Sequence, residues 1–191
     1  MNQQLVRCTW PGSDPIYVDY HDNEWGRPVR DSQDLFAKLI LDGAQAGLSW
    51  ITILKRREGY YQCFDHLNPY KMALYDDQKV AELLQDVRII RNRLKVAAAI
   101  GNAKAYIQME QEGINFSEFL WSFVGHKTIQ NQIKSSKDLP ATSPESDAMS
   151  KALKKAGFKF VGSTICYAFM QAVGMVNDHL EDCFCYSACQ E

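Results

Sequence analysis

Apolar residues recur along this chain at the three- and four-residue spacing of an amphipathic α-helix, and polar turn signals separate the apolar segments. In the stretch DSQDLFAKLILDG, four apolar residues between Leu35 and Ile40 fall on one face after an Asp-Ser cap. We predict further helices over residues 49–64, 76–85, 89–113 and 117–124. The longest of these would turn one face inward, formed by Ile90, Leu94, Ala97, Ala98 and Ile100.

The second half of the chain carries the clearest helix signals. Ser143 and Pro144 suit the cap and first turn of a helix over 144–156, and Gly157 suits its end. The segment STICYAFMQAVG is apolar nearly all round, which predicts a central buried helix over 163–173. Residues 124–143 are polar and end in DLPATSP, as is typical of a loop. Because no segment alternates apolar and polar residues as a strand does, we expect an all-α protein.

Composition narrows the class of protein. The chain has 191 residues, 46% of them hydrophobic, enough for one substantial core or for two small lobes that share a cleft. Its net charge of −2 gives no overall basic field, although basic residues cluster at 88–95 and 151–159. The first residues, MNQQLVRCTW, lack the apolar region of a secretory signal, and no run of about 18 apolar residues predicts a membrane span. Six cysteines without such a signal indicate a reducing compartment, where Cys/His pairs more often mean metal binding or packing than disulfides.

Two Cys/His pairs stand near opposite ends of the chain. His179 and Cys183 are four residues apart, a spacing that puts both side chains on one face of a helix. Cys8 and His21, with twelve residues between them, supply a second pair, and the four side chains together have the chemistry of a tetrahedral zinc site. Such a site would tie the two ends of the chain together, and it would be structural because protein fills all four positions. Spacing alone leaves an equal alternative, in which both cysteines are small buried apolar residues, and two later cysteines also compete as the second thiolate.

A second candidate site is the sequence GFKFVGSTICYAF, which joins two predicted helices by a tight glycine-containing turn. Backbone N–H groups at the start of the second helix can bind a DNA phosphate without reading the base sequence. Lys159 and the lysines before it would add attraction. The commoner meaning of such a pattern is a plain pair of helices with a solvated lysine face, so this signal is weak alone.

Aromatic residues crowd the first fifty positions, at Trp10, Tyr17, Tyr20, Trp25 and Trp50. Asp42 lies in the stretch DGAQAGLSW, where small neighbours let another surface approach closely. Aromatic faces with one carboxylate suit a pocket for a flat, electron-poor ring. The alternative is core packing, which must hold for some of these residues, and Trp25 is the first candidate for it.

Five motifs together resemble those of the bacterial DNA-3-methyladenine glycosylase I family, namely YHDNEWG, AGLSWITIL, FLWSFV, SKALKKAGFKFVGSTICY and VNDH. The resemblance runs from about Cys8 to Cys185. It implies an all-α helix-hairpin-helix glycosylase of base-excision repair, with residues 1–191 as one unit in which two helical lobes would flank a central cleft. It also implies a bacterial protein of the cytoplasm that is associated with the nucleoid, and because one hairpin would bind one face of DNA, we expect a monomer. This enzyme would flip 3-methyladenine out of double-stranded DNA that contains alkylated bases and hydrolyse its N-glycosidic bond.

The resemblance also assigns roles to residues. One structural zinc would be held by Cys8, His21, His179 and Cys183, which sets Cys185 and Cys189 aside. The base-binding pocket falls on Trp10, Tyr17, Tyr20, Asp42 and Trp50, with Asp42 as the catalytic residue. DNA contacts fall on Gly47, Leu48, Lys159, Gly162, Ser163 and Thr164. Of these, Leu48 would fill the space left by the flipped base.

Departures from the family pattern bear on the chemistry. The family usually has LEGQQAGLSW, whereas this chain has LDGAQAGLSW, so Asp42 is one methylene shorter than the usual Glu. Asn177 replaces an aspartate that is essential in many superfamily members, and Thr164 replaces the nucleophilic lysine of bifunctional ones. The resemblance therefore implies hydrolysis without strand cleavage. The substitutions at 42 and 44 leave two alternatives open: a catalytically inactive protein that binds alkylation damage, and a glycosylase for a different alkylated base.

Overall fold

The computed structural model describes residues 5–190 as a mostly helical protein, and residues 1–4 and 191 of the predicted single unit lie outside the described residues. The α-helices are α1 (Pro15–Asn23), α2 (Ser32–Gln45), α3 (Trp50–Leu54), α4 (Arg57–Cys63), α5 (Pro69–Met72), α6 (Asp77–Gln85), α7 (Arg93–Gln111), α8 (Phe116–Ser122), α9 (Pro144–Lys155) and α10 (Ser163–Ala172). Short 3-10 helices cover Asp65–Leu67 (η1), Ser136–Asp138 (η2) and Ser187–Cys189 (η3). The strands are β1 (Ile129–Gln130) and β2 (Val176–Asn177).

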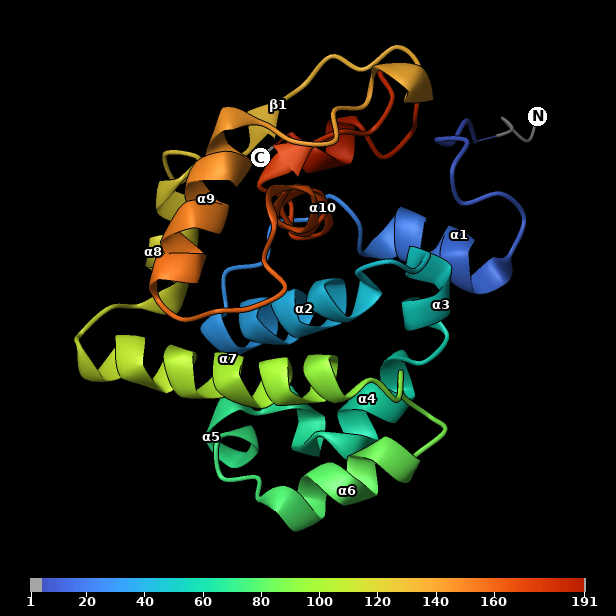
Figure 1. The fold of residues 1–191 in the computed structure, drawn as a ribbon. Coiled ribbons are helices and arrows are strands. Elements are labelled where there is room, and N and C mark those ends of the chain that lie inside the picture. The colour runs from blue at the N-terminus through green and yellow to red at the C-terminus, as the bar shows by residue number, and fades with distance from the viewer. Residues whose placement is uncertain (1–4, 191) are drawn as a thin grey trace.

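The central helix of the fold is α10, as the sequence predicts. Figure 1 views it end-on, with α9 beside it and α2 between it and the long helix α7. Cys166, Phe169 and Met170 on this helix are completely buried. Removing such side chains from water is the main stabilising contribution to a helical core, so the elements that carry the candidate residues are anchored here.

Helix ends fall where capping chemistry predicts them. The carboxylate of Asp31 accepts hydrogen bonds from the backbone N–H groups of Gln33 and Asp34 at the start of α2. Ser143 and Ser146 form a reciprocal capping box at the start of α9. Beyond the end of α9, Gly157 adopts a φ of +96°, a conformation that glycine tolerates best.

Some sequence predictions are wrong in detail. The single helix expected over 49–64 is two helices, α3 and α4, separated by residues 55–56. Gly59 on α4 packs closely on Arg88, since a Cβ on Gly59 would lie 2.6 Å from the Cβ of Arg88. On α7, Leu94 and Ala97 face solvent, with Leu94 71% exposed, because they lie on the face of the helix opposite to Val96 and Ala103. The fold is not purely α-helical, because β1, within the predicted loop 124–143, pairs in parallel with β2, which follows α10. This pairing is too short to show in an alternating sequence pattern.

The chain after α1 is fastened to the end of α10. The N–H of Val29 donates to the carbonyl of Val173 at 3.0 Å. Gly174, with a φ of +72°, comes so close to the backbone of Arg27 that a Cβ would lie 2.5 Å from it. Because only glycine fits here, α1 and α10 keep a fixed relation to each other.

No helix among residues 5–190 combines the length and the apolar character that crossing a bilayer requires.

Candidate functional site

A cavity of about 210 Å³ opens between α1, α2, α3 and α10. Its lining is mostly aromatic and apolar, and consists of Trp10, Tyr17, Tyr20, Trp25, Asp42, Gln45, Trp50, Leu139, Ala168, Gln171 and Ala172. All five residues that the sequence assigned to a pocket are therefore brought together. The ring centroids of Tyr20 and Trp50 lie 5.4 Å apart and those of Trp10 and Tyr17 4.8 Å apart, which is the spacing of aromatic pairs in contact.

The cavity holds polar atoms without hydrogen-bond partners. Among residues 5–190, three buried side-chain nitrogen or oxygen atoms have no partner, and they are Trp10 Nε1, Asp42 Oδ2 and Trp50 Nε1. All three belong to residues that line this cavity. An unsatisfied buried polar group is costly, and native proteins rarely keep one without a reason. The pattern of one carboxylate acceptor and two indole donors suits a ligand that offers both donors and acceptors.

The buried carboxylate is unusual in its acidity. Asp42 lies on α2 and is 2% exposed. Burial raises its pKa from 3.8 to about 7, and the charge of Lys38 one turn earlier only partly opposes this rise. A carboxyl that lacks a partner and is half-protonated near neutral pH is typical of a functional site.

Sequence reasoning missed part of the lining. Trp25, the first candidate for pure packing, is 8% exposed, but its ring also lines the cavity. Gln171 is held from behind, where its amide donates to Asp178 Oδ2 at 2.8 Å. Gln45, Leu139 and Gln171 were not singled out as pocket residues, although Gln45 lies within DGAQAGLSW, because they come from a helix end, a loop and a buried helix.

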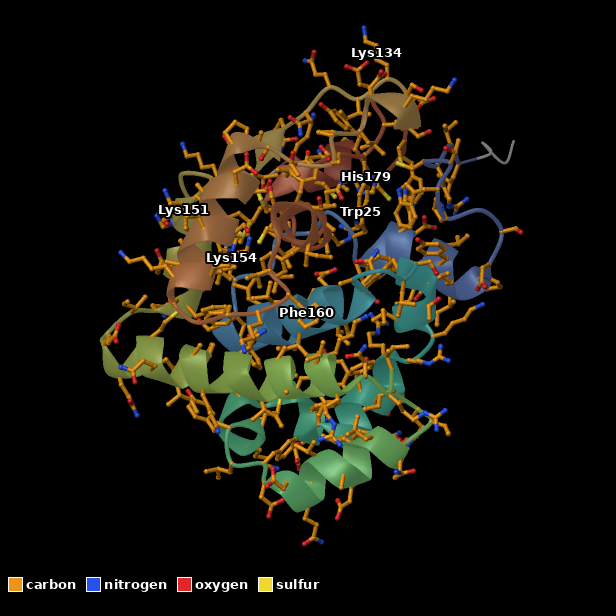
Figure 2. The ribbon with its side chains drawn as sticks, in the orientation of Figure 1. Trp25, Lys134, Lys151, Lys154, Phe160 and His179 are labelled. Atoms are coloured by element: carbon orange, nitrogen blue, oxygen red, sulfur yellow. The ribbon has the colours of Figure 1, made fainter. Side chains whose placement is uncertain are left out.

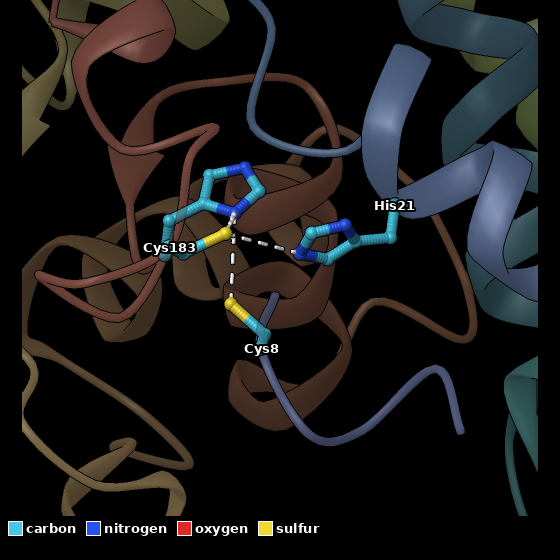
Figure 3. Close-up of side chains that lie close together, drawn as sticks. Cys8, His21 and Cys183 are labelled. Atoms are coloured by element: carbon cyan, nitrogen blue, oxygen red, sulfur yellow. Dashed lines mark hydrogen bonds between the residues drawn. The ribbon is translucent and has the colours of Figure 1, made fainter. Parts of the chain in front are cut away.

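The two Cys/His pairs meet in a second buried cluster. Cys8, His21, His179 and Cys183 each offer one ligand atom, and these atoms lie within 4.8 Å of one another. The Sγ of Cys183 lies 3.6 Å from His21 Nε2 and 3.6 Å from His179 Nδ1, and the Sγ of Cys8 lies 3.6 Å from His179 Nδ1. Figure 3 shows Cys8, His21 and Cys183 pointing toward one another. Zn–S and Zn–N bonds at tetrahedral angles place sulfur and nitrogen about 3.6 Å apart, so these separations fit a metal of that kind.

The outer ring nitrogens of both histidines are also occupied. His21 Nδ1 lies 2.7 Å from Asp22 Oδ1, and His179 Nε2 lies 3.1 Å from the carbonyl oxygen of Trp25. If each outer nitrogen donates its hydrogen, the inner nitrogen presents a lone pair to the centre of the cluster, as metal-binding histidines do. Gly26 allows this approach, because a Cβ there would lie 2.9 Å from His179 Nε2. The donor set and its surroundings therefore fit a metal ion.

The expected local structure around His179 and Cys183 is wrong. His179 and Cys183 do not share a helix face, because they lie in turns after β2. The competing thiols are placed otherwise. Cys185 Sγ points to the carbonyl oxygens of His21 and Asp22, at 3.9 and 3.8 Å, and could join only a lesser group with those two residues. Cys189 belongs to neither group.

The candidate hairpin corresponds to residues 156–162, which join α9 to α10. Gly162 caps α10 without any side-chain hydrogen bond to the helix start, so backbone N–H groups of the first turn are open to an external acceptor. Lys159 and Thr164 are exposed, whereas the hydroxyl of Ser163 lies 2.8 Å from that of Ser146 on α9. Lys151 and Lys154 project from α9 near this hairpin, whose Phe160 lies above α2 (Figure 2).

A tight exposed turn follows α2. The N–H of Leu48 donates to the carbonyl of Gln45 at 2.6 Å, and Gly47 has a φ of +77°, as a type II β-turn requires at its third residue. Leu48 is 40% exposed, although it is a large apolar residue. The turn lies in sequence between Gln45 and Trp50, which both line the cavity. The turn therefore places an exposed leucine between two residues that line the cavity.

Asn177 is structural in this protein. It is completely buried, and its amide donates to Gln130 Oε1 at 2.8 Å and to the carbonyl of Tyr186 at 3.0 Å. It does not line the cavity. Its neighbour Asp178 is also buried and accepts bonds from Asn131, Tyr167 and Gln171.

The fold and the cavity define a helical protein with an aromatic pocket whose lining residues carry three unpartnered polar atoms. The chain belongs to the methyladenine glycosylase family, whose model matches residues 10–186. It is 55% identical over 182 residues to the Escherichia coli (strain K12) protein DNA-3-methyladenine glycosylase 1, an alignment that covers 95% of this chain and 97% of that protein.

Solved structures agree with this family. A crystal structure of a 3-methyladenine DNA glycosylase I superposes with a TM-score of 0.93 at 52% identity, covering 95% of this chain and all (100%) of that one. The 3-methyladenine DNA glycosylase I of Staphylococcus aureus, in a study of its 3-methyladenine recognition, superposes with a TM-score of 0.91 at 36% identity and covers 97% of this chain and 96% of that one.

Proposed function

We propose that this protein is a DNA-3-methyladenine glycosylase that flips the alkylated base out of double-stranded DNA and hydrolyses its N-glycosidic bond. Membership of the methyladenine glycosylase family supports this. The observation that carries it is the set of three unpartnered polar atoms in an aromatic cavity. A methylated adenine offers an amino group to Asp42 and ring nitrogens to the indole N–H groups, so one flat ligand could satisfy all three.

The bond to be broken is intrinsically weak, so the main task of the protein is to recognise the alkylated base. In DNA, an adenine methylated at N3 carries a positive charge, so it leaves as a neutral molecule when its bond to the sugar breaks. Water forms the new bond to the sugar and releases a proton to solvent. Aromatic faces favour a cation by about 0.5–2 kcal/mol per contact. The carboxylate of Asp42 would accept a hydrogen bond from the amino group and offset the positive charge. Ordinary adenine is neutral and gains less, so pocket electrostatics would provide selectivity.

The DNA contacts follow from the two exposed elements. The open N–H groups at the start of α10, together with Gly162, Ser163 and Thr164, would bind backbone phosphate, and Lys159 would add its charge. The turn at Gly47 and Leu48 would enter the duplex and fill the space that the flipped base leaves. One hairpin and one turn suffice for one side of DNA, so we propose that the protein acts as a monomer, in the bacterial cytoplasm in association with the nucleoid.

We propose that Cys8, His21, His179 and Cys183 hold one zinc ion. The 3.6 Å separations between sulfur and nitrogen support this assignment. Four protein ligands would leave no open position, so the ion would join the two ends of the chain and take no part in the reaction. The single unit with two lobes around a cleft remains our proposal for the domain organisation.

A base-release assay on alkylated DNA tests the proposed function against its two alternatives. Release of 3-methyladenine supports the proposal. Release of another alkylated base, with 3-methyladenine left in place, would show that the shorter Asp42 has changed the specificity. Binding of damaged DNA without any release would identify an inactive damage-binding protein.

The reaction should leave no covalent intermediate. The described residues that line the cavity include no lysine, and Thr164 occupies the position where a bifunctional enzyme would carry its nucleophile. Borohydride treatment during excision is expected to trap no enzyme–DNA adduct. A known bifunctional glycosylase on a matched duplex serves as the positive control, and a stable adduct with this protein would contradict the prediction.

DNA binding should weaken steeply with salt, since phosphate contacts release counterions. Replacing Lys159 by alanine is expected to reduce the slope of log K against log salt concentration by about one unit, with little change in base preference. Lys134 is a matched control, because it is exposed and Figure 2 shows it at the upper edge of the molecule, well away from Phe160. A Lys134→Ala variant that changed the slope as much would contradict this placement.

A further inference from the structure

Lys95 on helix α7 is hydrogen-bonded to the start of the turn that carries Leu48. The Nζ of Lys95 donates to the carbonyl oxygen of Ala44 at 2.7 Å and to that of Ala46 at 2.8 Å. These carbonyls stand at the end of α2, where a helix has no internal donors left for them. A positive charge is also favourable at that end of a helix. Lys95 therefore closes α2 and fixes the first residues of the turn.

The same helix holds the hairpin through a second side chain. The amide of Asn102 donates to the carbonyl of Lys159 at 3.0 Å and accepts from the N–H of Lys159 at 2.8 Å. Asn102 is 4% exposed, so this paired contact is shielded from water. The hairpin is also pressed onto α2, because a Cβ on Gly43 would lie 3.4 Å from Phe160.

The two contacts are a fixed distance apart. Lys95 and Asn102 are seven residues apart on one helix, which is two turns and about 10 Å along the axis, on nearly the same face. The intervening face is packed, with Val96 and Ala99 among the core residues. A helix of 19 residues anchored this way does not stretch, so α7 helps to set the separation between the turn and the hairpin, together with the packing of Phe160 against Gly43 on α2.

We infer that Lys95 and Asn102 are positioning residues that hold the Leu48 turn and the Lys159 hairpin at the separation DNA binding requires. The inference rests on the proposed function, because it gives DNA as the ligand of both elements. Neither residue needs to touch the flipped base. Lys95 lines a different, smaller hollow from the one that holds Asp42. Lys95 and Asn102 thus act on the DNA-bound state, whereas the aromatic cavity recognises the base.

The test separates positioning from general stability. A Lys95→Met variant keeps the length of the side chain and removes its donors, while Lys95→Arg keeps the charge and the ability to donate. We expect Lys95→Met to weaken binding to a duplex with an abasic site, and to slow single-turnover excision, by roughly tenfold to a hundredfold. Affinity for free 3-methyladenine should stay within about twofold of the wild type, because the cavity is intact. Lys95→Arg should recover most of the DNA affinity.

Lys104→Met is the matched control, because Lys104 lies on the same helix and is exposed. It should leave DNA affinity unchanged. Asn102→Ala should behave like Lys95→Met, with weaker DNA binding and normal binding of the free base.

A double-mutant cycle gives the sharpest result. In a Leu48→Ala background, Lys95→Met should cost far less DNA affinity than in the wild type, since the side chain that it positions has gone. Equal losses in both backgrounds, or a matching loss of affinity for free 3-methyladenine, would overturn the inference. The DNA-affinity measurement does not depend on catalysis. A wild-type protein that bound DNA but released no base would therefore refute the proposed function alone.

Discussion

Asp42→Asn is expected to weaken binding of free 3-methyladenine, and to slow its excision from DNA, by about ten- to a hundredfold. The substitution keeps the size of the side chain but replaces the charge-assisted hydrogen bond with a neutral one in a cavity with little water. The loss corresponds to about 1.5–3 kcal/mol. Isothermal titration with the free base and single-turnover excision on methylated DNA measure the two effects.

Two comparisons isolate the role of this carboxylate. Asp42→Glu restores the residue usual in the family and should be tolerated. Affinity for an abasic duplex, which contains no base for Asp42 to contact, should change little in either variant. If Asp42→Asn excised 3-methyladenine at the wild-type rate, the carboxylate would be structural, and recognition would rest on Tyr20, Trp50 and the shape of the cavity.

The same variant should affect stability in the opposite direction. Because burial raises the pKa of Asp42 to about 7, the folded state favours the neutral carboxyl over the ionised one. The free energy of unfolding of the unliganded protein should therefore fall as the pH rises from about 4 to about 7, by something on the order of 3 kcal/mol from this group. Asp42→Asn removes this decline. Denaturant unfolding at pH 5 and pH 8 should show that the free energy of unfolding of the variant, relative to that of the wild type, is larger at pH 8 than at pH 5.

Loss of the proposed zinc ion is the second large effect that we expect. Cys183→Ser should lower the zinc content from about one per chain and reduce the free energy of unfolding by about 3–5 kcal/mol. The thiol of Cys183 is placed for this role, since its Sγ lies 3.6 Å from both His21 Nε2 and His179 Nδ1. Metal analysis and denaturant unfolding of the purified variant measure both outcomes.

Cys185→Ser is the matched control, because Cys185 is equally buried and only two residues away. It should keep the zinc. The opposite pattern, with metal retained in Cys183→Ser and lost in Cys185→Ser, would show that the ligand assignment is wrong. Where a metal-depleted protein still folds, its affinity for free 3-methyladenine should stay close to that of the wild type, since Asp42 and Trp50 lie outside the cluster.

The parts of the site that the sequence predicts are those with a local chemical signature. The Asp31 and Ser143 caps are short-range events, and their hydrogen bonds form as expected. The Cys/His cluster was predicted from the chemistry of its ligands, but its geometry was not, because a turn rather than a helix brings His179 and Cys183 together. Spacing along the chain cannot distinguish these two arrangements.

Other features depend on contacts between distant segments, and the sequence gives no local sign of them. Gln171 lines the cavity, and the buried carboxylate of Asp178 accepts a hydrogen bond from its amide. Lys95 appeared in the sequence as one charge in a basic cluster, yet it serves as a donor to the carbonyls that end α2. The spacing of Leu94 along the helix favours burial, but Leu94 is exposed and its neighbours Val96 and Ala98 are buried instead. In each case the tertiary packing decided the role.

With a metal bound, Cys8 and Cys183 would join positions 175 residues apart (183 − 8), so the polypeptide would form a closed ring. A ring has fewer conformations when unfolded than an open chain, and for a link of this span the entropic stabilisation of the native state is about 5 kcal/mol in the covalent case. A protease that cut one exposed peptide bond between His21 and His179 would open the ring without separating the fragments. In the nicked molecule the metal would still link the two fragments. Chelation of the metal would then remove this link, which the cut alone leaves in place.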